Sequence, residues 1–254
     1  MRKVVDELEQ RLAAPTRKAV TGALHKAART RRPRHNDIDW PRTIEANLRH
    51  YQPEYRTVIP ERLIGYGRRS PKVLREVILC IDESGSMAES VVYSSVFGAV
   101  LASIRALRTR LVVFDTAVVD LTDSIDDPVD VLFGVQLGGG TDIAGALGYC
   151  ATVITNPRNT VLVLISDLFE GGVRENLLRR MSDFVSAGVT VIAPLALNDR
   201  GAPSFDHDNA AALASLGVPA FACTPDKFPD LMAVAIQRGD ITGWAAGNDI
   251  LTQQ

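Results

Sequence analysis

The stretch VLREVILCIDESGSM, residues 73–87, joins an apolar run to a short turn of carboxyl, hydroxyl and glycine residues. An apolar run followed by turn residues predicts a strand, which we place at Val73–Ile81. Because the run is nearly continuous rather than alternating, we expect both faces of this strand to be covered, as in parallel sheets. The polar turn then begins where the strand ends.

The chain beyond this stretch repeats the pattern of apolar strands and helical segments. Further strands are predicted at Leu111–Asp115, Val118–Thr122, Val161–Ile165, Val189–Leu197 and Ala220–Cys223. Helices are predicted at Ser90–Leu107, Val129–Phe133, Ile143–Ile154, Arg174–Ala187, Ala210–Leu216 and Phe228–Arg238. This alternation predicts an α/β fold, a doubly wound and mostly parallel sheet with helices on both faces. The tight turn after Asp115 predicts one antiparallel pair of strands.

The first part of the chain has a different character. Residues 3–29 follow a helical period, in which Pro15 is expected either to interrupt the helix or to begin a turn of it. After a basic, proline-broken linker, Asp39 is a candidate cap for a second helix with Pro41 in its first turn. Three apolar residues would share one face of that helix, namely Ile44, Leu48 and Tyr51. We therefore divide the chain into a basic, mainly helical segment (1–72), a core domain (73–240) and a tail (241–254).

The net charge of −2 conceals an asymmetry along the chain. Residues 1–75 hold 18 Lys and Arg against 8 Asp and Glu, a balance of +10. Residues 76–254 hold 10 against 22, a balance of −12. Such a division indicates either different partners for the two parts or a basic segment that docks on an acidic one.

Three polar loops could meet at one edge of the predicted sheet. Asp82, Ser84 and Ser86 follow the first strand, Thr141 follows three glycines, and Asp167 follows a later strand. Ligands of open parallel sheets bind at the carboxyl ends of the strands, so these loops are candidates for one site. Carboxylate and hydroxyl oxygens suit Mg²⁺, Mn²⁺ or Ca²⁺ rather than zinc or copper. Each loop taken alone is better explained as an ordinary turn or helix cap, and only their combination favours a metal site; for Asp115 and Asp142 we prefer the turn or cap interpretation.

The same residues carry a resemblance to a known family. Asp82-Glu83-Ser84-Gly85-Ser86 resembles the D-x-S-x-S signature of von Willebrand factor A (VWA) domains, and Thr141 and Asp167 match the family's other two elements. The resemblance covers about residues 73–240. It implies a metal-ion-dependent adhesion site in which Ser84, Ser86 and Thr141 contact the ion. Asp82 and Asp167 would then often act through water, and an Asp or Glu of a partner would complete the site.

The region 39–63, followed closely by the stretch 82–87, further resembles prokaryotic VWA proteins of the CoxE-like type. Such proteins typically work beside MoxR-type AAA+ ATPases, so the resemblance implies a Mg²⁺-dependent protein-binding adaptor in protein maturation or metal insertion. One alternative is a magnesium-chelatase-type subunit, although the acidic, proline-rich linker that would favour it is absent. A nucleic-acid-associated protein is a second alternative, which the sparse aromatic residues of the basic segment disfavour.

Other features separate this chain from enzymes and membrane proteins. No Walker lysine follows the glycine-rich loop, and Ser84 lies outside the G-x-S-x-G pattern, so we expect no catalytic activity. The charged first residues and the absence of an apolar run of about 18 residues argue against a signal peptide or a membrane span. Cys80, Cys150 and Cys223 show no metal or disulfide spacing, so reduced thiols in a cytoplasmic protein are expected.

Overall fold

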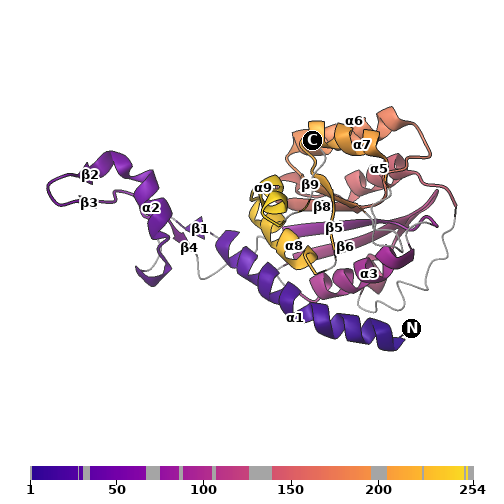
Figure 1. Cartoon of the computed structure of the whole chain (residues 1–254), viewed down its shortest axis with the longest axis horizontal. Helices are drawn as coiled ribbons and strands as arrows, with labels where there is room; N and C mark the ends of the chain where they lie inside the picture. Colours follow the sequence, from indigo (N-terminus) through magenta and orange to yellow (C-terminus); the bar gives the residue numbers. More distant parts are fainter. Residues whose placement is uncertain are drawn as a thin grey trace.

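A six-stranded sheet forms the centre of the molecule (Figure 1). Its strands are β5 (Arg75–Asp82), β6 (Leu107–Phe114), β7 (Val118–Asp120), β8 (Thr160–Ile165), β9 (Thr190–Leu195) and β10 (Ala220–Ala222). They are ordered β10-β9-β8-β5-β6-β7, and all pairs are parallel except the edge pair β6–β7. The predicted α/β fold with one antiparallel edge strand is therefore confirmed, with β5 in the middle of the sheet.

The computed structural model describes residues 2–27, 29–30, 35–66, 75–85, 88–104, 107–125, 139–195, 205–224, 226–248 and 250. Within these ranges the helices are α1 (Arg2–Ala27), α2 (Trp40–Ala46), α3 (Ala88–Ala102), α5 (Ile143–Val153), α6 (Arg174–Ala187), α7 (His207–Ser215), α8 (Phe228–Gln237) and α9 (Ile241–Ala246). Short 3-10 turns occur at η1 (His35–Asp37), η2 (Leu48–His50), η3 (Thr122–Ser124) and η4 (Pro157–Asn159). The predicted helix Val129–Phe133 lies outside the described residues.

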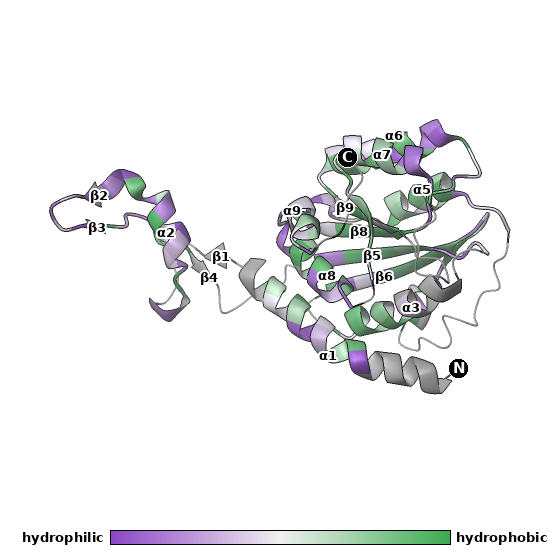
Figure 2. Ribbon diagram, in the orientation of Figure 1, coloured by the Kyte–Doolittle hydropathy of each residue, from purple (hydrophilic) through white to green (hydrophobic). Residues whose placement is uncertain are grey.

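Two hydrophobic cores cover the two faces of the sheet, and β5 contributes to both. Val77, Leu79 and Ile81 join the core beneath α1, α3 and α8, whereas Ile78 and Cys80 join the core beneath α5, α6 and α7. Successive side chains of a strand point to opposite faces, so a strand buried on both sides must be apolar throughout. Figure 2 shows hydrophobic colouring along much of the central strands, with hydrophilic residues near the starts of β5 and β6.

The boundary between α3 and β6 was predicted wrongly. The predicted helix Ser90–Leu107 ends at Ala102, and Leu107 begins β6, four residues before the predicted start of that strand. The amides of Ser103 and Ile104 donate to the carbonyls of Ala99 and Leu101, which closes the last turn of α3. Arginines at 108 and 110 alternate with inward-facing residues in β6, and this alternation concealed the first half of the strand.

Of the two alternatives for Pro15, interruption of the first helix is wrong. α1 is one helix of 26 residues with Pro15 on its exposed side. A proline removes a single backbone donor, and the hydroxyl of Thr16 donates to the carbonyl of Leu12 (2.7 Å) in the same turn. α1 packs on α3 and α8 through Leu12, Val20 and Ala23, so it shares the core of the central domain.

Residues 29–30 and 35–66 form an arm that projects from the domain (Figure 1). It contains α2 and two short antiparallel pairs, β2 (Tyr51–Gln52) with β3 (Thr57–Val58), and β4 (Gly65–Tyr66) with β1 (Arg29–Thr30). As predicted, Asp39 caps α2 by accepting from the amide of Arg42, and Pro41 lies in the first turn. The helix ends earlier than expected, so Leu48 and Tyr51 fall outside it, and both are exposed.

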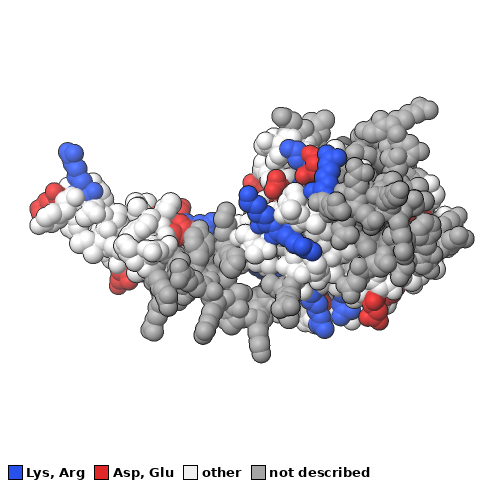
Figure 3. All heavy atoms as spheres, turned by 90° about the horizontal axis from the view of Figure 1, so that it is seen from below, with Lys and Arg blue, Asp and Glu red and all other residues white. Residues whose placement is uncertain are grey.

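Polar side chains rather than an apolar core hold the arm together. The buried Asn47 amide group donates to the carbonyls of Thr43 (2.6 Å) and Arg62 (2.8 Å), and its oxygen accepts from the amides of Glu61 and Arg62. Figure 3 shows basic and acidic side chains interspersed on the described parts of the arm and of the domain.

The region predicted as a tail contains α9, which Asp240 caps by accepting from the amide of Gly243 (2.8 Å). Ile241 and Trp244 pack on the same core as α8. The predicted division of the chain at residues 72 and 240 stays a prediction, but both flanking helices contribute side chains to the central core.

Candidate metal centre

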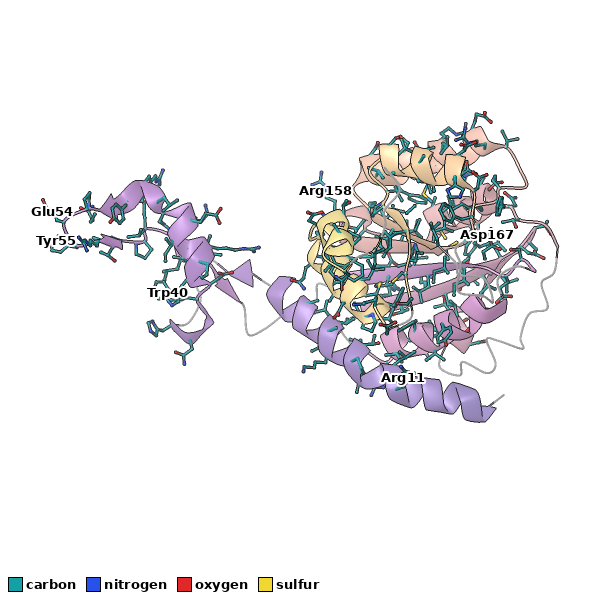
Figure 4. The ribbon with its side chains drawn as sticks, in the orientation of Figure 1. Arg11, Trp40, Glu54, Tyr55, Arg158 and Asp167 are labelled. Atoms are coloured by element: carbon teal, nitrogen blue, oxygen red, sulfur yellow. The ribbon has the colours of Figure 1, made fainter. Side chains whose placement is uncertain are left out.

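The candidate residues lie at the carboxyl edge of the central strands. Asp82 is the last residue of β5, and Asp167 follows β8 by two residues. Because Ile81 pairs with Ile165 in a parallel register, both strands deliver their next residues to the same edge. Figure 4 shows Asp167 on the side of the domain away from the arm that carries Trp40, Glu54 and Tyr55.

Asp82 is fully buried and is oriented by two loops. One carboxylate oxygen accepts from the backbone amide of Ser84 (2.9 Å), and the other accepts from the hydroxyl of Ser166 (2.8 Å). Burial raises the pKa of Asp82, hydrogen bonds from Ser84 and Ser166 oppose that rise, and the charge of Asp167 adds to it. Ser166, which donates to Asp82, directly precedes Asp167, so this hydrogen bond brings the two carboxylate-bearing segments together.

Glu83 begins the loop that carries Ser84, which is itself buried. The amide of Glu83 donates to the carbonyl of Phe114 (2.8 Å), which fixes the loop against the end of β6. Burial raises the pKa of the Glu83 carboxyl to about 7, with further contributions from the charges of Asp115 and Asp82. The edge therefore gathers carboxyl groups from the ends of β5, β6 and β8.

The loop that carries Thr141 is held from one side by Asp115, the residue after β6. One carboxylate oxygen of Asp115 accepts from the amide of Gly139 (3.1 Å), and the carbonyl of Asp115 accepts from the amide of Asp142 (2.7 Å). Asp142 in turn caps α5 by accepting from the amide of Gly145 (2.7 Å). The predicted turn and cap roles of Asp115 and Asp142 are confirmed.

The Asp167 loop is buried and anchored to α7. The carbonyl of Asp167 accepts from the amide of Asp206 (2.9 Å), and the carbonyl of Leu168 accepts from the side chain of Asn209 (2.9 Å). Leu168 adopts the left-handed region (φ 63°) with its side chain fully buried. The next side chain, Phe169, is 49% exposed, so this turn leaves an apolar surface beside Asp167.

Residues 8–232 match the family described as VWA domain containing CoxE-like protein. The chain belongs to this family. It is 36% identical over 240 residues to YehP of Escherichia coli (strain K12), which is 92% of this chain and 62% of that relative. The chain thus spans less than two thirds of the length of this relative.

Among solved structures, the VWA chain is similar to an aerotolerance-related membrane protein from Bacteroides fragilis, with a TM-score of 0.51 at 13% identity. That match covers 64% of this chain and 98% of the other. A von Willebrand factor type A structure from Catenulispora acidiphila matches with a TM-score of 0.48 at 14% identity, over 65% of this chain and 42% of the other. At such identities the likeness concerns the fold alone. None of the helices that the structure describes has the length and hydropathy of a membrane span.

Four of the five predicted donors of the VWA site lie in the described loops, and Ser86 lies outside the described residues. In the part of the chain that the structure describes, no group of three or more His, Cys, Asp or Glu side chains is placed to hold a metal ion. The predicted set does not require such a cluster, since it combines two carboxylates with hydroxyl groups. Hard oxygen donors around two mutually repelling carboxylates fit a hard divalent cation, and the ligand assignment stays a prediction.

Two polar residues of the VWA edge escaped the sequence analysis. Ser166 orients Asp82, and the only signal for it was a hydroxyl at the end of an apolar strand. Glu170 accepts from the amides of Ile143 (2.9 Å) and Ala144 (3.2 Å) through one carboxylate oxygen. Its other oxygen accepts from the amide of Gly172 (2.9 Å). Burial raises the pKa of Glu170, and the amide hydrogen bonds oppose that rise.

Proposed function

We propose that this VWA chain is a metal-dependent protein-binding adaptor that uses the carboxyl edge of its sheet. The observation that carries the proposal is the buried Asp82 carboxylate, held by Ser84 and Ser166 in electrostatic range of Asp167. A buried carboxylate that repels its neighbour is unfavourable by itself. Its position at the ligand-binding edge of an open α/β sheet supports a role in holding a cation.

Asp82, Ser84, Ser86, Thr141 and Asp167 would hold the ion, and Mg²⁺ suits them best, with Mn²⁺ or Ca²⁺ as alternatives. When bound, such a cation supplies a positive site that can accept a carboxylate oxygen from a partner. The chain contributes orientation, because Ser84 and Ser166 fix the Asp82 carboxylate while Asp115 fixes the Thr141 loop. Phe169 and Val173, which are 49% and 56% exposed, supply apolar contact area on the loop after β8, which also carries Asp167.

The partner that we propose is a MoxR-type AAA+ ATPase that presents an Asp or Glu to the ion. Membership of the CoxE-like family supports this choice, because the resemblance implies work beside such ATPases in protein maturation or metal insertion. We infer binding rather than catalysis, since the edge gathers carboxylates and hydroxyls without a nucleophile–base pair among the described residues. All three cysteines are free thiols, which supports a reducing, cytoplasmic setting.

The test is the affinity of the purified chain for the purified MoxR-type ATPase of the same organism, measured by biolayer interferometry. We expect binding in Mg²⁺, loss in EDTA, and recovery when Mg²⁺ is restored. Thr141→Ala should abolish binding, whereas Thr152→Ala, which removes an exposed hydroxyl elsewhere on α5, should leave it unchanged. A complex that survives both EDTA and Asp167→Ala would move the interface away from this edge.

A further inference from the structure

Glu170 connects the loop after β8 to the first turn of α5. Its carboxylate accepts from the amides of Ile143 and Ala144, two of the donors that a helix N-terminus leaves without partners inside the helix. Asp142 satisfies the next donor, the amide of Gly145. The start of α5 is thus capped jointly by its own Asp142 and by a residue from a different loop, and Thr141 lies directly before this cap.

Backbone contacts strengthen the connection. The amide of Gly171 donates to the carbonyl of Thr141 (2.9 Å). A Cβ atom at Gly171 would lie 2.6 Å from that carbonyl oxygen, which no real contact tolerates. The Thr141 loop is therefore fixed from one side by Asp115 and from the other by Glu170 and Gly171.

We propose that Glu170 is a positioning residue for the metal centre. It holds Thr141 at the edge by capping α5 from the neighbouring loop, and it does so without acting as a ligand. Both of its carboxylate oxygens are engaged with backbone amides, one with Ile143 and Ala144 and the other with Gly172. The inference rests on the proposed function, since it assigns Glu170 a role at the same cation site.

Four variants distinguish a role of Glu170 in holding the Thr141 loop from a simple attraction between its charge and the cation. Glu170→Ala loses the cap, and Glu170→Gln keeps one oxygen acceptor for the amides of Ile143 and Ala144 while it loses the charge. Gly171→Ala changes no charge but forces the Thr141 carbonyl away. Glu175→Ala removes an exposed carboxylate from the first turn of α6 and serves as the control.

The experiment titrates each metal-stripped variant with Mg²⁺ and Mn²⁺ by calorimetry, and compares amide hydrogen exchange at Ile143 and Ala144 without metal. Outer-shell partners of metal ligands typically contribute about 10- to 100-fold in affinity. We expect a loss of about this size in Glu170→Ala and Gly171→Ala, and faster exchange at both amides in Glu170→Ala. Glu170→Gln should stay close to the parent, and Glu175→Ala should equal it.

Each other outcome has a distinct meaning. If Glu170→Gln and Glu170→Ala lose affinity equally while Gly171→Ala keeps it, Glu170 acts through its charge and the positioning role is wrong. Parent-like affinity in both Glu170→Ala and Gly171→Ala also overturns it. If Glu170→Ala does not unfold cooperatively and is therefore misfolded, the affinities of Gly171→Ala and Glu170→Gln still decide whether Glu170 acts by positioning. A parent that binds neither ion refutes the proposed cation site itself, and faster amide exchange in Glu170→Ala would then support only the cap.

Discussion

At the end of β5, two neighbouring carboxyl groups have pKa values above their ordinary range. Asp82 and Glu83 are both raised chiefly by burial, and each also lies near another carboxylate. A raised carboxyl pKa means that the folded chain keeps its proton at a pH where the unfolded chain has released it. Ionisation of these carboxyl groups is therefore unfavourable in the metal-free protein, and the positive charge of a bound cation would offset this cost.

The metal-stripped protein should consequently lose stability as the pH rises through this range. In the folded chain the pKa of Glu83 is raised to about 7, whereas its ordinary value is 4.5. Between these values the folded state holds more protons, so its stability falls with increasing pH, and the loss is complete above about pH 7. Thermal unfolding at pH 5 and pH 8 measures this, and Glu83→Gln should flatten the dependence. Identical pH dependence in parent and variant would contradict the assignment.

A third carboxylate, Glu76 near the start of β5, has a structural role at the opposite end of the strand. It is 3% exposed and accepts from Arg110 (3.3 Å) and from the hydroxyl of Thr160 (3.1 Å). Glu76→Ala leaves Arg110 without this partner in a mostly buried position. Breaking a buried pair in this way should cost about 3 kcal/mol of unfolding free energy. Urea denaturation tests this, with Glu61→Ala, which breaks an exposed pair with Arg49, expected to cost under about 1 kcal/mol.

Among the elements, α1 shows how a basic helix can belong to the core. Leu12, Val20 and Ala23 face α3 and α8, while Arg11 and Lys18 remain exposed. The packing of this helix is therefore apolar, although the helix carries six basic and three acidic side chains. Pro15 fits because it lies on the exposed side.

Leu12→Ala should therefore destabilise the whole domain. Truncation of a buried leucine removes apolar contact and leaves a cavity, which together cost about 2–5 kcal/mol. The value should fall at the lower end, because Leu12 lies near the edge of the core and is 6% exposed. Chemical denaturation of Leu12→Ala and of the neighbouring control Arg11→Ala measures the difference. Equal midpoints would show that α1 contributes nothing to the stability of the domain.

The elements also show what the sequence could and could not predict. Asp82 and Asp167 could be placed because each follows a continuous apolar strand, and parallel strands end at one edge. The first half of β6 could not, because Arg108 and Arg110 interrupt the apolar pattern. Glu170 could not be predicted either, since its role depends on the loop after β8 approaching α5, which no local pattern encodes.

Over the whole molecule, the balance of +10 before residue 76 and −12 after it does not produce a charge-driven interface in the described residues. The ion pairs seen there each lie within one half, as in Arg49–Glu61 and Arg110–Glu76. The only described bond of an α1 arginine across the two halves joins Arg17 to the hydroxyl of Ser103 (3.1 Å). The charge asymmetry left open a basic segment that docks on the acidic domain or one with a separate partner, and the contact that α1 makes with the domain is apolar packing.

The exposed cations of α1 leave nucleic-acid binding as the alternative to be tested. Deletion of this segment is a poor test, because it would also remove Leu12 and Val20 from the core.

Arg11→Glu combined with Lys18→Glu changes only exposed side chains and should keep the fold. We expect at most weak binding of duplex DNA, because two of the described arginines on the arm, Arg42 and Arg49, are already paired with carboxylates. Such binding should weaken with salt at a log–log slope of about −0.9 per phosphate neutralised. Fluorescence anisotropy at physiological salt measures it. Tight binding that the double variant removes would make the basic segment a nucleic-acid site and would separate its role from that of the carboxyl edge of the sheet.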